Sequence, residues 1–169
     1  MHRDALLAAL TKLLARILLP VAWLRFGRGS ARWVTAQWAL GLRFPAEDLN
    51  GLRPEVYHAF TCARAEALWR HGQLIGLTSG HRDAAVQHQM FVAELMHAGP
   101  EAPRVLPPER SAHVLGTAMD VRPREGAQWL ETHGWRYGLY RTYDNEWWHF
   151  EHHPEGPPPR LPHPGYLGA

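Results

Sequence analysis

The 169-residue chain has little cysteine and little lysine: one residue of each, Cys62 and Lys12. A single cysteine excludes an intramolecular disulfide framework and a cysteine-rich zinc finger, and it does not distinguish a reducing from an oxidising compartment. The sequence also lacks a Gly-x-Ser-x-Gly motif, which argues against a serine hydrolase with a nucleophile elbow. Its basic residues are scattered without an aromatic-interleaved motif, which argues against a nucleic-acid-binding groove.

Histidine and tryptophan, in contrast, are abundant, with 12 and 8 residues, and the formal net charge is +2. A chain of this length forms a single domain with a sizeable core. Because nearly all of the basic residues are arginines, the composition suits contact with an anionic surface such as cell wall or lipid headgroups, and it equally suits simple solubility.

The first segment is an apolar stretch with helical periodicity over residues 4–19, which Pro20 should end or kink. Lys12 and Arg16 interrupt this run, so it is shorter than the roughly 20 residues of a membrane span. It also fits a cleavable signal peptide poorly. Two interpretations remain open: a helix packed on the domain, or a basic amphipathic helix through which residues 1–26 contact a membrane surface.

We divide the chain into an N-terminal helical extension (1–50), a central domain (51–153) and a proline-rich tail without a packing pattern (154–169). Residues 27–53 are irregular in pattern, with a loop at 27–30. A helix should begin at Pro54 and stop at Gly72, followed by a strand over 73–77. A second helix, capped by Asp83, should end near residue 99. After a loop over 98–110 we expect a strand at 117–121, a helix at 126–133 and a last strand at 147–152.

Two motifs carry the chemistry of the sequence. In a strand, alternate residues share a face, so Asp120 and His149 can meet if their strands pair. Gly116 permits a close turn that returns His113 to the same point, and the small Ala118 leaves room beside an ion. Two imidazoles and one carboxylate are a catalytic zinc set, because the fourth position stays open for water. The motifs read Ser111-x-His113-x-x-Gly116-x-Ala118-x-Asp120 and Glu146-x-x-His149.

This arrangement suits hydrolysis of a peptide bond. Zinc lowers the pKa of its water to about 7 and polarises the scissile carbonyl. Glu146 would take the proton from the water and pass it to the leaving amine, and Arg82 is the candidate cation for the developing negative charge. Ser111 can hydrogen-bond the substrate, and three aromatic side chains can form the pocket wall: Tyr137, Trp147 and Trp148. Glu151 and His152 either orient the ligands or are exposed strand residues, and we prefer the second interpretation.

The two motifs together resemble the zinc D-Ala-D-Ala peptidases, the VanY/VanX-like peptidase M15 group. The turn Ser79-Gly80-His81-Arg82, followed by Gln87, resembles that family's Ser-Gly-Tyr-Arg turn and its following glutamine. The stretch containing Trp129-Leu130, Gly134 and Tyr137-Gly138 is similar to the one before the family's final motif. The resemblance covers roughly residues 73–153. It departs from the family pattern at His81, where tyrosine is usual, and at Asp83, where serine is usual.

The resemblance implies an α+β fold in which helices flank a small central antiparallel sheet and zinc lies in the cleft, here with an extra N-terminal amphipathic helix. It implies one zinc ion per chain on His113, Asp120 and His149. Glu146 would be the base and Arg82 would steady the transition state. Gln87 would contact the substrate. The Trp147-Trp148 pair is similar to the dipeptidase branch of the group, but the acidic insert of that branch is absent.

We therefore expect a zinc metallopeptidase that acts on peptidoglycan stem peptides in the manner of a D-alanyl-D-alanine carboxypeptidase. A D-Ala-D-Ala dipeptidase and a cell-wall endopeptidase are alternatives within the group. A non-catalytic zinc module that binds peptidoglycan is the alternative from another class, and the presence of Glu146 argues against it. The substrate favours the cell envelope or periplasm, and the lack of a clear signal peptide leaves the cytoplasm open. The oligomeric state is not predicted.

Overall fold

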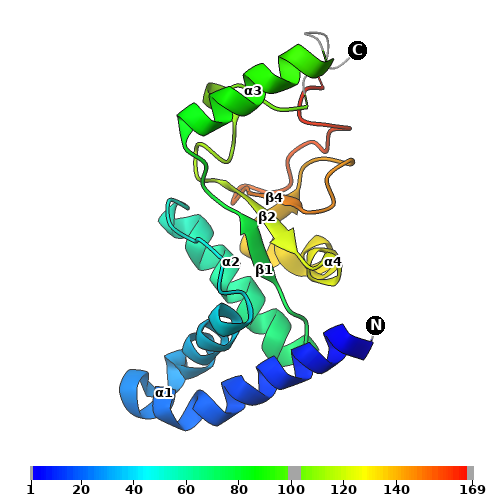
Figure 1. The fold of residues 1–169 in the computed structure, drawn as a ribbon. Helices are drawn as coiled ribbons and strands as arrows, with labels where there is room; N and C mark the ends of the chain where they lie inside the picture. The colour runs from blue at the N-terminus through cyan, green and yellow to red at the C-terminus, as the bar shows by residue number, and fades with distance from the viewer. Residues whose placement is uncertain (1, 99–103, 167–169) are drawn as a thin grey trace.

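The computed structural model describes residues 2–98 and 104–166. One antiparallel sheet of four strands, in the order β1-β2-β4-β3, lies between helices (Figure 1). This confirms the predicted α+β class. The strands are β1 (Gly76–Ser79), β2 (Ala118–Arg122), β3 (Leu139–Arg141) and β4 (His149–His152). The helices are α1 (His2–Arg43), α2 (Pro54–Glu66), α3 (Ala84–Ala98) and α4 (Arg124–His133), with short helical turns at Ala67–His71, Pro108–Arg110 and Gly134–Tyr137.

Helix α1 is longer than the sequence pattern indicated. It passes Pro20 without ending and continues to Arg43, with a break in direction at Gly27, whose φ is 78°. Pro20 lies on an exposed position, so the helix loses a backbone hydrogen bond there but no packing. The loop at 27–30 reduces to one non-helical residue, and the irregular stretch predicted after it is helical up to Arg43.

The break at Gly27 lets the two halves of α1 pack against each other. Three alanines at their contact, Ala15, Ala22 and Ala31, are completely buried, and small side chains allow two helices to approach closely.

The expectation that this helix is too short for a membrane span is wrong. By length and composition alone, α1 over residues 5–43 is long and apolar enough to cross a membrane. Most of its apolar segment is not buried.

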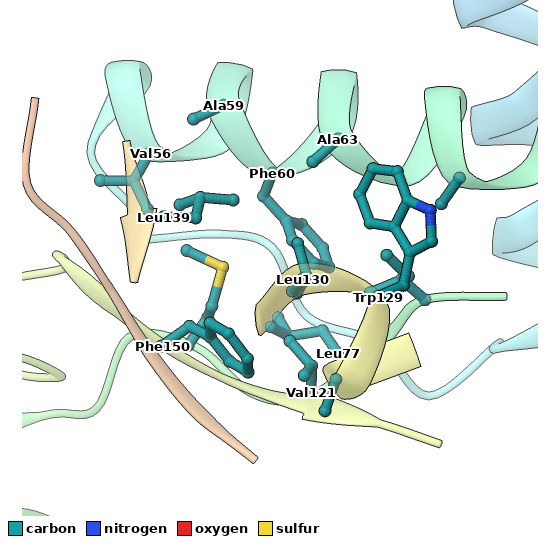
Figure 2. Close-up of a cluster of buried hydrophobic side chains, with 14 of the residues drawn as sticks. Val56, Ala59, Phe60, Ala63, Leu77, Val121, Trp129, Leu130, Leu139 and Phe150 are labelled. Atoms are coloured by element: carbon teal, nitrogen blue, oxygen red, sulfur yellow. The ribbon is translucent and has the colours of Figure 1, made fainter. Parts of the chain in front are cut away.

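Helix α2 begins at Pro54 and leads to a left-handed Gly72, as predicted. Its inner face packs on the sheet through Val56, Phe60 and Ala63, which form one core cluster with residues of β1, β2, β4 and α4 (Figure 2). Strand β1 starts at Gly76, three residues later than expected. Asp83 precedes α3 and accepts a hydrogen bond from the Ala85 amide at 2.8 Å, as the cap prediction required.

The sheet pairing sets the positions of the residues that matter for function. Asp120 of β2 lies directly opposite His149 of β4, and Ala118 lies opposite Glu151. Strand β3 was not predicted, because three residues are too few for an alternating pattern to show. It pairs with the outer side of β4 and completes the sheet.

The segment after β4 packs on the domain, in contrast to the expectation of a tail without packing. The amide of Leu161 donates a hydrogen bond to the carbonyl of Thr142 at 2.9 Å, and Leu161 forms a parallel bridge with Tyr143. Arg160 forms ion pairs with Glu131 and Asp144. The prolines of this segment prevent a regular strand, but its extended backbone still offers carbonyl and amide groups for single β-bridges.

Candidate metal centre and active site

Three side chains from separate segments converge at one end of the β2–β4 pair. The Asp120 Oδ1 atom lies 3.1 Å from Nδ1 of His149 and 3.4 Å from Nε2 of His113. One ligand atom from each residue lies within 4.8 Å of the other two. Both histidines are buried, and Asp120 is nearly so. The structure thus brings together the three residues that the sequence motifs selected as metal ligands.

Gly116 makes the turn that positions His113. Its φ is 69°, and a Cβ atom built on it would lie 2.5 Å from the carbonyl oxygen of Gly51. The amide of Gly116 donates to the His113 carbonyl at 3.1 Å, which closes the turn. Only glycine combines this backbone conformation with such a close approach. The turn therefore carries the His113 side chain back to Asp120 of β2.

Each imidazole is oriented by an acceptor on the side away from Asp120. Nδ1 of His113 lies 2.7 Å from the carbonyl of Gly80, so this nitrogen carries the proton and Nε2 presents its lone pair. Nε2 of His149 lies 3.1 Å from Glu151, which leaves Nδ1 facing Asp120. Such an acceptor behind each imidazole is typical of histidines that bind zinc. Two nitrogen lone pairs and one carboxylate oxygen fit a zinc ion.

The charges of the cluster favour a cation. Burial opposes ionisation of Asp120, but hydrogen bonds from His113 and His149 outweigh it and hold the pKa of this carboxyl well below its usual range. Burial alone would lower the pKa of His149, but its hydrogen bonds to Asp120 and Glu151 raise that pKa to about 9. The pair thus holds positive charge between Nδ1 and the carboxylate, where a metal ion would replace the proton.

Glu146 lies beside this cluster, on the turn that leads into β4. Its Oε2 atom is 3.8 Å from Nδ1 of His149. Burial, and then the negative charge of Asp120, raise the pKa of Glu146, although the neighbouring His149 acts in the opposite direction. This position places a carboxylate next to the ligand set without making it part of the set.

Arg82 is held in place by side chains on both sides of it. Its Nη1 donates to Oε1 of Gln87 at 2.7 Å, and its Nη2 donates to the hydroxyl of Ser79 at 3.3 Å. Gln87 is buried and donates in turn to the carbonyl of Leu106 at 2.6 Å. Gln87 was expected to contact the substrate, and in the structure it fixes the guanidinium of Arg82.

These residues line a cavity of about 190 Å³. The predicted Ser111 and Trp148 belong to its wall, together with Arg82, Gln87, Glu146 and the three candidate ligands. Sequence reasoning missed Arg104 and Tyr143, which also line it. Arg104 follows a proline-rich stretch without a readable pattern. Tyr143 lies three residues before Glu146, and that proximity is the only signal for it in the sequence.

Three other side chains are placed differently from expectation. Tyr137 and Trp147 pack against the core cluster and do not belong to the cavity lining described for this structure. The hydroxyl of Tyr137 donates to Glu66 at 2.6 Å, and the guanidinium of Arg124 lies over the Trp147 ring. Glu151 is not an exposed strand residue, because its carboxylate is buried against His149 and His153.

Comparison with known proteins supports the fold. No family model matches the chain, and no curated protein matches it. Among solved structures, the chain is similar to a crystal structure of the vancomycin resistance D,D-pentapeptidase VanY, a mutant from a VanB-type resistance cassette, in complex with Zn(II). The TM-score is 0.52 at 20% sequence identity, over 63% of this chain and 76% of that chain. At this identity the likeness establishes a shared fold.

Proposed function

We propose that the protein is a zinc-dependent peptidase that hydrolyses D-Ala-D-Ala type bonds in peptidoglycan peptides, as a D-alanyl-D-alanine carboxypeptidase does. The observation that carries the proposal is the convergence of His113, Asp120 and His149, each imidazole held by an acceptor from behind. The fold shared with a zinc-bound D,D-pentapeptidase supports the same reaction class.

In this proposal His113, Asp120 and His149 would hold one zinc ion, which would supply a Lewis acid and lower the pKa of a bound water. Glu146 takes a proton from the attacking water and delivers it to the leaving amine. Its carboxylate lies beside the ligand set, with Oε2 3.8 Å from Nδ1 of His149, and it lines the same cavity as the three ligands.

Arg82 faces the same cavity with its guanidinium already fixed by Gln87 and Ser79. A preorganised cation stabilises the charge that grows on the carbonyl oxygen, because no reorganisation is needed during the reaction. Arg104 is a second cation on the cavity wall, and it suits the terminal carboxylate of a peptide. The small volume and the two cations favour removal of one C-terminal residue over cleavage within a chain.

The test is product analysis by mass spectrometry with the zinc-loaded full chain. We expect free D-alanine from an N-acylated tripeptide that ends in D-Ala-D-Ala, and no product from the L-Ala-L-Ala equivalent. Cleavage of the free D-Ala-D-Ala dipeptide alone would indicate a dipeptidase, and cleavage of cross-linked muropeptides alone would indicate an endopeptidase. Bound zinc without turnover of any D-peptide would overturn the proposal and favour a non-catalytic module.

Glu146→Gln is the variant that tests the mechanism. It should bind zinc normally but lose turnover by about 10²- to 10⁴-fold, since the amide accepts no proton at neutral pH. Glu155→Gln, at an exposed position after β4, is the matched control and should keep full turnover. Turnover of the Glu146 variant at the level of this control would assign the base to another residue.

A further inference from the structure

The first half of α1 leaves an apolar face without a protein partner in the described structure. Its inner face is buried, and Ala15 and Ala22 of this face belong to core clusters with residues of the second half. On the other side, side chains between 51% and 92% exposed recur every three or four residues and form a stripe. The stripe consists of Leu6, Leu10, Leu13, Ile17, Val21 and Leu24. A continuous exposed apolar face of this kind marks an interaction surface.

The charge of α1 has one sign. Residues 5–43 contain six basic residues and no aspartate or glutamate. Lys12 and Arg16 flank the stripe by helical spacing, and Arg28 follows just after the break at Gly27. An apolar face bordered by cations is complementary to a membrane with anionic headgroups. A protein partner would have to be acidic and apolar at once.

Aromatic side chains gather where the two halves of α1 meet. Trp23, Phe26 and Trp38 are all more than a third exposed. Phe26 stacks edge-on against Trp38, the guanidinium of Arg25 lies over Phe26, and that of Arg28 lies over Trp23. Tryptophan and arginine together are typical of the level of lipid headgroups, where one part of the side chain is apolar and the other is hydrated.

A basic cavity of about 780 Å³ lies beside the N-terminal part of the stripe. Ala5, Ala9 and Lys12 of α1 form one wall, and Arg43 and Arg122 form part of the others. The Nε atoms of both arginines are buried and have no hydrogen-bond partner among residues 2–98 and 104–166. Exposed Glu125 is the one acidic residue on the wall. Both guanidinium groups lie over the Phe44 ring. Two cations next to an apolar face suit the phosphate of a lipid.

We infer that α1 binds in the plane of an anionic lipid bilayer, with the stripe in the acyl boundary and the basic residues at the phosphates. An in-plane position keeps the buried contacts of Ala15 and Ala22, whereas a spanning helix would lose them and would place Lys12 and Arg16 in the hydrocarbon. Figure 1 places α3 at the opposite end of the molecule from α1, so this position keeps α3, which contributes Gln87 to the wall of the 190 Å³ cavity, away from the lipid. This inference does not depend on the proposed function.

The experiment is co-sedimentation of the full chain with vesicles of phosphatidylcholine alone or with 30% phosphatidylglycerol. We expect at least tenfold stronger binding to the anionic vesicles, weakened by salt. The double variant L13Q/I17Q should lose at least tenfold in binding with its thermal unfolding unchanged, because both side chains are exposed. The charge variant R16E/R28E should lose the preference for anionic vesicles.

The matched control is V86Q/M96Q, which removes two exposed apolar side chains from α3 and should bind as the parent does. Equal binding to both vesicle types, or undiminished binding of L13Q/I17Q, would overturn the inference. A dimer that L13Q/I17Q dissociates, without vesicle binding by the parent, would assign the stripe to a second copy of the chain. Resistance of the bound protein to alkaline extraction would indicate a helix that spans the membrane, and it would also overturn the inference of in-plane binding.

Discussion

Glu151 shows how one residue on β4 supports another. Residues 149 and 151 share a face of the strand, and the Glu151 carboxylate lies 3.1 Å from Nε2 of His149. Its second oxygen lies 3.1 Å from Nε2 of His153. Because Nε2–H is held by Glu151, the lone pair of Nδ1 stays directed at the position between His149 and Asp120. The ligand set therefore depends on a residue that is not itself a ligand.

Replacement of Glu151 by alanine should weaken zinc binding about 10- to 100-fold, since the imidazole of His149 loses the acceptor that selects its tautomer. Competition with a chromophoric chelator measures this affinity. Glu151→Gln should recover part of the loss, because the amide oxygen still accepts a hydrogen bond. Exposed Glu155→Ala is the control. Zinc affinity of Glu151→Ala equal to that of the control would show that the orientation is set elsewhere.

At the residue scale, the sequence predicted which residues would be the metal ligands, but not which side chains orient them. His113, Asp120 and His149 stand out because residue type and spacing together limit the chemistry. Glu151 looks like any polar strand residue until the neighbouring strand buries it opposite Ala118. Gln87 was selected from the sequence, but as a substrate contact and not as the partner of Arg82. Arg104 lies in a segment without a local pattern that would indicate its place on the cavity wall.

The turn at Gly116 is the element on which the ligand geometry depends most. Gly116→Ala should lower the free energy of unfolding by at least about 2 kcal/mol, because a left-handed alanine costs roughly 1–2 kcal/mol and its Cβ would meet the Gly51 carbonyl. Urea denaturation measures the loss. Gly72→Ala is the control: its φ is 65° but no atom lies within 4 Å, so only the conformational cost applies. Equal losses in the two variants would contradict this account of the turn.

Elements with a start and a stop residue were predicted well, and elements without them were not. Pro54 and Gly72 bound α2 and its last turn, and Asp83 caps the start of α3. Helix α1 was cut short in the prediction at Pro20, because an exposed proline breaks the pattern without ending the helix. Its true interruption is Gly27, where a positive φ turns the chain.

At the scale of the molecule, a buried ion pair links the N-terminal extension to the sheet. Arg64 of α2 donates to Glu47 at 2.8 Å, and both side chains are almost fully buried. Arg64 also donates to Gln37 of α1 at 2.6 Å, and Glu47 accepts from the Leu77 amide of β1 at 2.5 Å. Three elements therefore meet at one pair of charges, between the predicted segments 1–50 and 51–153.

Glu47→Ala should destabilise the protein by about 3–5 kcal/mol, because the Arg64 charge stays buried without its partner. Thermal or urea unfolding followed by circular dichroism should remain a single transition, as expected when the extension and the domain unfold together. The pair of exposed Arg70 and half-buried Glu66 is the comparison, and Arg70→Ala should cost less than about 1 kcal/mol. A small loss in Glu47→Ala, or two separate transitions in the parent, would show that the extension is an independent unit.

The α+β fold class was predictable because the motifs resemble a family with that fold, and the expected strands and helices agree with it. The packing of residues 154–166 could not be predicted, because this proline-rich segment makes its contacts through backbone hydrogen bonds. The contact between the two halves of α1 could not be predicted either, because it depends on the close approach of small alanines and not on a hydrophobic pattern. Long-range contacts of this kind appear only when the whole chain is folded.

The central claim is that His113, Asp120 and His149 hold one zinc ion. Anomalous diffraction at the zinc edge, from crystals of the full chain grown with zinc, tests it most directly. The account predicts one strong peak within about 2.0–2.2 Å of Nε2 of His113, Nδ1 of His149 and a carboxylate oxygen of Asp120. A peak at another place, or no peak among these three side chains, would contradict it.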